Sequence, residues 1–281
     1  ASMIIVGASF IGVEYATVFA ELGVRVILVE LMDRILPLED EEAADFLSSE
    51  LGRQGVAIRT SCRVLSLRDL AGGVVLLAQK NGETMEMRAE CALLCTGRQP
   101  VLHTAELDKL GVAYDRSGIK VDARMMTSVP GIYAAGDVTG GMMLAHRAEL
   151  QGRIAAESMF GGSHPAYNEA FIPSVVYSHP QIARVGLTHR RALAEGLEVQ
   201  VVKSPYSANI IARAELLGQG FVKAVFHQGK MIGAVAVGDH AAELLAPLSL
   251  AVSNGLTKKQ LASWVLPHPT LGEILAPLID G

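Results

Sequence analysis

The first thirty residues alternate between strand-like and helix-like patterns around a glycine-rich turn. The apolar run Met3–Val6 stops at Gly7 and predicts a buried parallel strand. Apolar residues then recur with helical spacing over 11–22, and Gly23 predicts the end of that helix. Val24–Val29 predicts a second strand, rich in β-branched residues. The chain therefore begins with a βαβ unit, which commits this part to a parallel sheet covered by helices.

The turn of this unit has the form of a dinucleotide-binding loop. It runs from Gly7 to Gly12, with Ser9 in place of the middle glycine of G-x-G-x-x-G. The first glycine permits the tight turn, the last lets the helix pack on the strand, and the helix N-terminus offers N–H groups to a pyrophosphate. Phe10 and Ile11 complete the predicted loop.

The end of the second predicted strand carries a carboxylate, Glu30. A carboxylate at this position accepts hydrogen bonds from both ribose hydroxyls of NAD and repels a 2′-phosphate. We therefore predict NAD(H) rather than NADP(H), although Arg25 and Arg34 could favour a phosphate. The alternative is an ordinary βαβ turn with a solvated glutamate.

The remaining pattern divides into three parts. Residues 39–54 predict a helix, 56–59 a strand, and 91–95 a buried strand that ends the first part. Between them lies an antiparallel meander over 63–67, 74–79 and 84–88, with Asn81-Gly82 as a hairpin turn. The second part predicts a short strand at Gly131–Ala135 and a helix at 144–160. Alternating strands at 199–203, 220–226 and 231–237, then helices at 241–254 and 257–263, predict an α+β domain on an antiparallel sheet.

Composition excludes several classes of function. The 281 residues carry a formal charge of −5 without a basic cluster, which argues against nucleic acid and anionic membranes as partners. The longest stretch without charge, 244–257, is too short for a transmembrane helix and contains Pro247. Three cysteines form no disulfide framework, so we expect a reducing cytoplasm, and we expect no metal site. Cys91 and Cys95 would lie about 13 Å apart on one strand and are expected to be small core residues.

Two further motifs carry chemistry. Gly136-Asp137 ends a predicted strand and precedes a helix, so Asp137 can bind a sugar or flavin ribityl hydroxyl, or cap the next helix. His268 precedes Glu273 by five residues. If a helix starts after Pro269, the carboxylate can hold one imidazole nitrogen and leave the other as a base, although isolated histidines in such tails are more often structural.

The order of four motifs resembles the pyridine nucleotide–disulfide oxidoreductase family of flavoproteins, and most closely its dihydrolipoamide dehydrogenase branch. The motifs are GASFIGVE, CTGRQP, GIYAAGDVTGGMMLAHRAELQGRIAAE and VLPHPTLGE. The resemblance covers nearly the whole chain. It implies an α/β fold with a Rossmann-like NAD-binding domain (1–97), the second part of an FAD-binding domain (98–166) and an α+β dimerisation domain (167–281).

The resemblance also implies site residues. Glu14 would approach the nicotinamide, Phe10 would take the place of an aromatic gate over the flavin, and Gly97 would contribute to the NAD site. Gly136, Asp137, Leu144, Ala145 and His146 would contact FAD. His268, oriented by Glu273, would be the acid–base catalyst and would serve the other subunit of a homodimer. Electrons would pass between a dithiol or disulfide, on a small molecule or a lipoyl domain, and NAD(H) through FAD.

The sequence departs from the family pattern in two features. The family's first FAD-binding glycine loop and its redox Cys-x4-Cys precede the NAD domain, and neither occurs here. We expect a piece of a longer enzyme that is inactive alone. The alternatives are another flavoprotein disulfide reductase, a soluble pyridine nucleotide transhydrogenase, or a dimeric nucleotide-binding module without catalysis. Transhydrogenases usually lack the His-Pro-Thr found at 268–270, and glutathione reductase-like enzymes favour NADPH, against which Glu30 argues.

Overall fold

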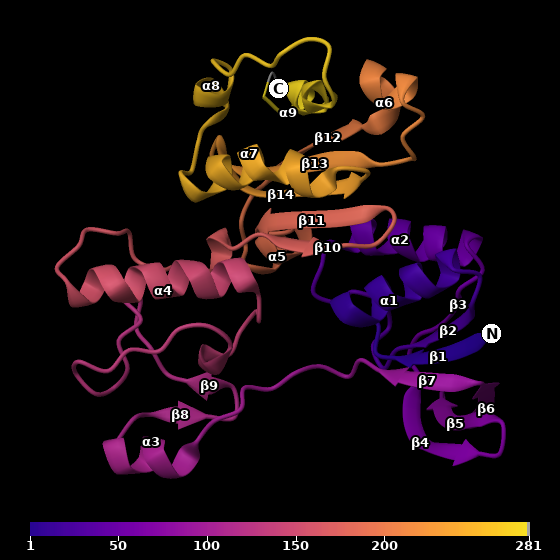
Figure 1. Ribbon diagram of the computed structural model, residues 1–281. Helices are drawn as coiled ribbons and strands as arrows, with labels where there is room; N and C mark the ends of the chain where they lie inside the picture. Colours follow the sequence, from indigo (N-terminus) through magenta and orange to yellow (C-terminus); the bar gives the residue numbers. More distant parts are fainter. Residues whose placement is uncertain (280–281) are drawn as a thin grey trace. The chain divides into compact units, whose positions relative to one another are not determined.

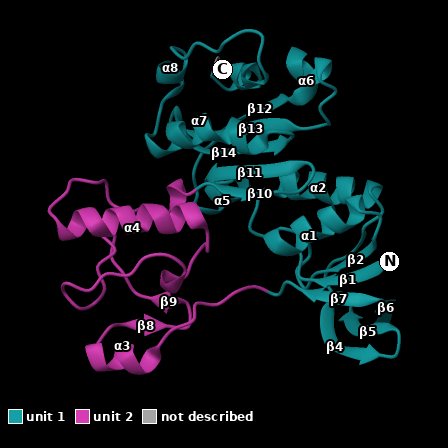
Figure 2. Cartoon of the chain, viewed as in Figure 1, with its two compact units in different colours: residues 1–96, 173–281 teal, residues 97–172 magenta. Residues whose placement is uncertain are grey.

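The computed structural model describes residues 1–279 and divides the chain into two compact units (Figure 1, Figure 2). The first unit combines Ala1–Thr96 with the segment that starts at Pro173, and the second is Gly97–Ile172. The three domains expected from the sequence are continuous stretches of chain, whereas the first compact unit combines two separate stretches. The boundaries of the three domains stay a prediction. Among residues 1–279, no helix is long and apolar enough to cross a membrane.

The chain opens with the predicted βαβ unit, built into a parallel sheet of order β3-β2-β1-β7. Gly23, at φ +78°, follows the last turn of the first helix as predicted. The elements of this layer are β1 (Ser2–Val6), α1 (Phe10–Glu21), β2 (Arg25–Val29), α2 (Glu41–Arg53), β3 (Ala57–Arg59) and β7 (Cys91–Leu94).

A three-stranded antiparallel meander packs on this sheet. It consists of β4 (Arg63–Leu70), β5 (Gly73–Lys80) and β6 (Glu83–Ala89). Asn81 and Gly82 both have positive φ, which matches the two-residue hairpin turn predicted from their sequence. Ile4 and Leu76 meet in the core between the meander and the sheet.

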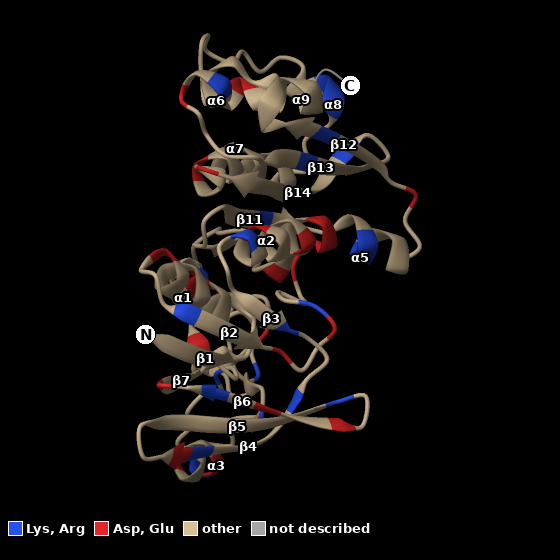
Figure 3. Cartoon of the chain, turned by 90° about the vertical axis from the view of Figure 1, so that its right-hand side faces the viewer, with Lys and Arg blue, Asp and Glu red and all other residues tan. Residues whose placement is uncertain are grey.

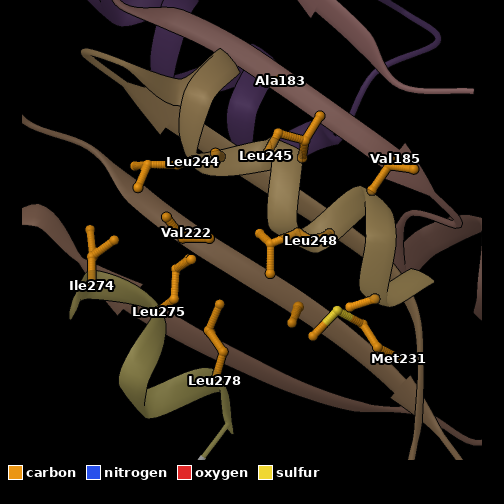
Figure 4. Close-up of a cluster of buried hydrophobic side chains, with 14 of the residues drawn as sticks. Ala183, Val185, Val222, Met231, Leu244, Leu245, Leu248, Ile274, Leu275 and Leu278 are labelled. Atoms are coloured by element: carbon orange, nitrogen blue, oxygen red, sulfur yellow. The ribbon is translucent and has the colours of Figure 1, made fainter. Parts of the chain in front are cut away.

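The predicted antiparallel sheet near the C-terminus has five strands in the order β10-β11-β14-β13-β12. Leu244, Leu245 and Leu248 of the long helix α7 pack on one face of it, together with Ile274 and Leu275 (Figure 4). The elements are β10 (Ser174–Val176), β11 (Gln181–Gly186), α5 (His189–Ala194), β12 (Gln200–Pro205), η3 (Tyr206–Ala208), α6 (Ile210–Ala214), β13 (Phe221–His227), β14 (Lys230–Gly238), α7 (Ala241–Ser253), α8 (Lys258–Leu261), η4 (Leu271–Leu275) and α9 (Ala276–Ile279).

A shared core makes the two separate stretches of chain one unit. Leu47 of α2 belongs to the same buried cluster as Ile182 of β11 and Val235 of β14, on the sheet face opposite α7. Acidic residues at the start of α2 pair with basic residues of β11, β12 and β13 (Figure 3). Apolar contacts and ion pairs therefore hold the parallel sheet against the antiparallel one.

The second unit has little regular structure besides one long helix. The expected strand at Gly131–Ala135 is absent; Gly131 has φ +85°, which ends extended backbone, and only an isolated bridge joins Met126 to Tyr133. The elements are α3 (Thr104–Leu110), β8 (Tyr114–Asp115), β9 (Gly118–Ile119), η1 (Asp137–Thr139), α4 (Ala145–Met159) and η2 (Glu169–Phe171).

The cysteines correct one expectation. Cys91 is exposed rather than buried, because β7 lies at the edge of its sheet, and Cys95 is half-buried just beyond that strand. Cys62 is buried, and all three thiols are free. Burial raises the pKa of the Cys95 thiol, so this side chain stays protonated near neutral pH.

Candidate functional site

The glycine turn between β1 and α1 is too crowded for side chains at its two ends. A Cβ on Gly12 would lie 1.8 Å from the carbonyl oxygen of Gly7, and one on Gly7 would lie 2.3 Å from that of Cys95. Gly7 also has φ +96°. Ser9, by contrast, has extended backbone (φ −82°, ψ −168°), so the middle position tolerates a side chain. The departure from G-x-G-x-x-G therefore leaves the backbone path of the loop unstrained.

The first turn of α1 has no acidic residue, and the side chain of Ser9 does not cap it. Its leading N–H groups therefore remain available to an anion. Phe10 is half-buried and Ile11 is exposed at the start of the helix. These residues provide the features that a pyrophosphate-binding turn requires.

Glu30 lies directly after β2 and ties this loop to the sheet. It is 8% exposed; its Oε2 accepts the Ala8 N–H at 2.7 Å and its Oε1 accepts the Met32 N–H at 2.8 Å. These two bonds could not be expected from the sequence, because backbone N–H donors leave no pattern in the side chains. Each oxygen keeps a further lone pair, so the carboxylate can hold the loop and accept a ribose hydroxyl.

The two arginines that could favour a phosphate are placed differently. Arg25 begins β2, whereas Glu30 follows its other end. Arg34 forms an ion pair with Glu41 at 2.9 Å. Glu14 of α1 also has a partner, since its Oε1 accepts the Tyr177 N–H at 2.8 Å and links α1 to the end of β10.

The sequence-predicted pair near the C-terminus forms a hydrogen bond. Nδ1 of His268 lies 2.9 Å from Oε1 of Glu273, whose other oxygen accepts the Thr270 N–H at 2.9 Å. The Thr270 N–H and His268 both lower the pKa of Glu273, so the carboxylate stays charged in mildly acidic solution. The His268 side chain is 72% exposed, and its Nε2 has no hydrogen-bond partner within residues 1–279. The imidazole is thus oriented on one side and open on the other.

Residues predicted to contact FAD gather in the second unit. Gly136 packs closely on the first half of α4, since a Cβ there would lie 3.4 Å from Ala148, and its N–H donates to Gln151. Asp137 starts η1 with a half-exposed carboxylate. Leu144 caps α4, which begins with Ala145 and His146.

Arg98, which was not predicted from the sequence, also belongs to this group. Its guanidinium donates to the Met143 carbonyl at 2.7 Å and lies 3.8 Å from the Asp137 carboxylate. It therefore links Asp137 to the segment before α4. Its place in the CTGRQP motif, next to Gly97 at φ +105°, was the signal that could have identified it.

The site residues thus form three groups on separate segments. No hydrogen bond between described residues joins the His268 turn to the glycine loop. In the described part of the chain, no group of three or more His, Cys, Asp or Glu side chains could hold a metal ion.

Comparison with known proteins assigns both stretches of chain to one family. The family model described as pyridine nucleotide-disulphide oxidoreductase matches residues 1–152, and that of its dimerisation domain matches 172–278. Dihydrolipoyl dehydrogenase of Chlorobaculum tepidum is 38% identical over 97% of this chain, and that of Mycobacterium tuberculosis is 39% identical over 100%.

Solved structures agree with this assignment. LpdA from Mycobacterium tuberculosis has a TM-score of 0.90 at 30% identity over 99% of this chain, and covers it with 60% of its own length. The HOCl-induced flavoprotein disulfide reductase RclA from Escherichia coli has a TM-score of 0.88 at 28% identity, over 99% of this chain and 64% of its own. The chain spans 59% and 61% of the two curated relatives. Because the first family model alone covers more than half of the residues, the chain belongs to the pyridine nucleotide-disulphide oxidoreductase family.

Proposed function

We propose that this chain forms the NAD-binding, second FAD-binding and dimerisation parts of a dihydrolipoyl dehydrogenase-like enzyme. The enzyme would transfer two electrons from a dithiol, on a small molecule or a lipoyl domain, to NAD⁺. The hydrogen bond between His268 and Glu273 carries this proposal, because it leaves a base open to an incoming thiol. The curated relatives bear the name dihydrolipoyl dehydrogenase. The unpaired cysteines are the reason to place it in the cytoplasm.

The chemistry assigned to His268 follows from its hydrogen bond. A charged Glu273 accepts only, so Nδ1 of the imidazole carries the proton and Nε2 keeps a lone pair. Nε2 can then take the proton of a substrate thiol, and the carboxylate stabilises the resulting imidazolium. In the proposed homodimer this side chain would act on the active site of the other subunit.

The loop residues would bind the nucleotides. The turn from Gly7 to Gly12 would offer α1 N–H groups to the NAD pyrophosphate, Glu30 would accept a ribose hydroxyl, and Glu14 would approach the nicotinamide. Asp137, held by Arg98, would bind a flavin hydroxyl beside Leu144, Ala145 and His146. Bound FAD supplies the two-electron carrier between dithiol and NAD⁺.

The proposal is tested on the enzyme expressed from its complete coding sequence. We expect His268→Ala to lower the turnover of dihydrolipoamide by about 10²–10⁴-fold, the range of general acid–base catalysis. His189→Ala removes an exposed histidine at the start of α5 and serves as the control. A near-normal rate of the His268 variant would refute the catalytic role. Comparable or faster turnover of glutathione disulfide would favour another disulfide reductase.

A second candidate applies to the 281 residues by themselves. All three cysteines are free, and the chain spans 59% of the Chlorobaculum relative. It could therefore act as a dimeric nucleotide-binding module without catalysis. We expect the purified chain to bind little flavin and not to reduce lipoamide. Stoichiometric flavin absorbance after gel filtration would contradict this candidate.

A further inference from the structure

Asn209 is only 5% exposed, and both the oxygen and the nitrogen of its side-chain amide form hydrogen bonds. It is the residue before α6, and its Oδ1 accepts the Ala212 N–H at 2.9 Å as an N-cap. Because the oxygen must face this donor, the NH₂ group faces the opposite way. The cap thereby aims two N–H donors away from α6.

Those two donors bind the turn that carries the acid–base pair. Nδ2 lies 3.1 Å from the Thr270 carbonyl oxygen and 3.2 Å from that of Leu271, both between His268 and Glu273 in sequence. The turn's own polar contacts are local: Thr270 Oγ1 donates to the Pro267 carbonyl, and the Glu273 carboxylate accepts the Thr270 N–H. Asn209 thus ties the turn to a segment about sixty residues earlier.

The turn has open space beside it into which it could move if the hydrogen bonds from Asn209 were lost. A cavity of about 280 Å³ lies beside it, lined by His268 and Glu273 as well as by Asn209. Ile274 and Leu275 anchor the following turn in the core, whereas the His268 side chain is 72% exposed. Without the two amide bonds, the segment before this anchor could shift into the cavity.

We propose that Asn209 is a positioning residue, which fixes the Thr270–Leu271 carbonyls and through them the direction of His268. The inference rests on the proposed function, in which Nε2 of His268 must meet a substrate thiol. A displacement of about 1 Å in a catalytic group can lower the rate by about a hundredfold. The amide therefore acts on turnover without touching the substrate.

Substitution of Asn209 can separate the cap of α6 from the bonds to the Thr270 and Leu271 carbonyls. Asn209→Asp keeps an oxygen for the Ala212 N–H, since Asp and Asn are equally good N-caps, but it sets a carboxylate oxygen against two carbonyls. Asn209→Ser also keeps the cap and is too short to reach the turn. Thr188→Ala is the matched control, because it removes the side-chain cap of α5, which accepts the Arg191 N–H.

In the complete enzyme we expect both Asn209 variants to lower kcat for dihydrolipoamide by roughly ten- to a hundredfold. KM for NAD⁺ and the oxidation of NADH by ferricyanide, which needs no thiol proton transfer, should stay at the wild-type level. Thr188→Ala should leave all three quantities unchanged. A loss of ferricyanide activity equal to the loss of dithiol turnover would mean a merely structural role and would overturn the inference.

The outcome also separates this inference from the proposed function. If His268→Ala is inactive and both Asn209 variants turn over dihydrolipoamide normally, the positioning role is wrong and the proposed function stands. If the wild-type enzyme does not turn over dihydrolipoamide, the proposed function fails; if His268→Ala is itself fully active, the catalytic role of His268 fails, and the positioning role fails with it.

Discussion

The buried ion pair between Arg184 and Glu39 should be the most costly polar contact to break in the first unit. Arg184 lies in β11 and Glu39 just before α2, with side chains 7% and 1% exposed. The guanidinium donates to both carboxylate oxygens, at 2.7 and 3.2 Å. Ser174 adds one hydroxyl bond to the carboxylate at 3.1 Å. The pair joins the parallel sheet's helix layer to the antiparallel sheet.

Arg184→Met removes the charge and keeps most of the side-chain volume. Glu39 would then stay buried with the Ser174 hydroxyl as its remaining side-chain donor. Removing one partner of a buried ion pair lowers the free energy of unfolding by about 3–5 kcal/mol, because the remaining charge is left buried without a counter-charge. Arg190→Met is the control, since Arg190 pairs with Glu41 across the same interface with a 70% exposed side chain. An exposed pair contributes about 0–1 kcal/mol.

Urea unfolding measures the free-energy change of both variants, as a shift of the transition midpoint at an unchanged slope. The double variant Arg184→Met with Glu39→Leu should regain most of the loss, because well-packed apolar residues replace a buried pair at little or no cost. Equal, small effects of Arg184→Met and Arg190→Met would show that water reaches the pair and would refute this reasoning.

Further predictions concern three residues of the candidate site, Glu30, Glu273 and Gly12. Glu30→Ala should weaken NAD(H) binding by about 1–2 kcal/mol in calorimetry, through lost charge-assisted hydrogen bonds, and unchanged affinity would mean that the carboxylate only holds the loop and accepts no ribose hydroxyl. Glu273→Gln would turn an amide N–H toward His268 and place its proton on Nε2, so dithiol turnover should fall at least about a hundredfold. Folding lowers the pKa of Glu273, so the stability that its charge contributes is present above the unfolded pKa of about 4.3. This stability is lost as the pH falls through the lower folded value. The unfolding temperatures of wild type and Glu273→Gln should therefore become equal only below about pH 4. Gly12→Ala should weaken NAD(H) binding at least tenfold, since its Cβ would lie 1.8 Å from a carbonyl oxygen. Gly52→Ala in α2 is the control: nothing lies within 4 Å of the added Cβ, so the substitution should raise the free energy of unfolding by about 0.5–1 kcal/mol.

The sequence predicted the elements whose patterns are long or sharply punctuated. The βαβ unit, the meander with its Asn81-Gly82 turn and the helix of α4 are confirmed to within a few residues. β10 and β11 were not predicted, because runs of three to six residues give a weak period. The strand expected at Gly131–Ala135 was wrong, since apolar residues there pack without a neighbouring strand to extend the ladder.

The site was predictable where partners are close in sequence. His268 and Glu273 are five residues apart, and their contact follows from one turn. Asn209 and the Thr270–Leu271 carbonyls are about sixty residues apart, and the local pattern around Asn209 indicates only a helix cap. The two ends of its amide serve different elements, and only the end that serves the neighbouring helix leaves a trace in the sequence. The acid–base pair is thus encoded locally, while the bonds that hold its turn in place arise only when β12, α6 and η4 come together.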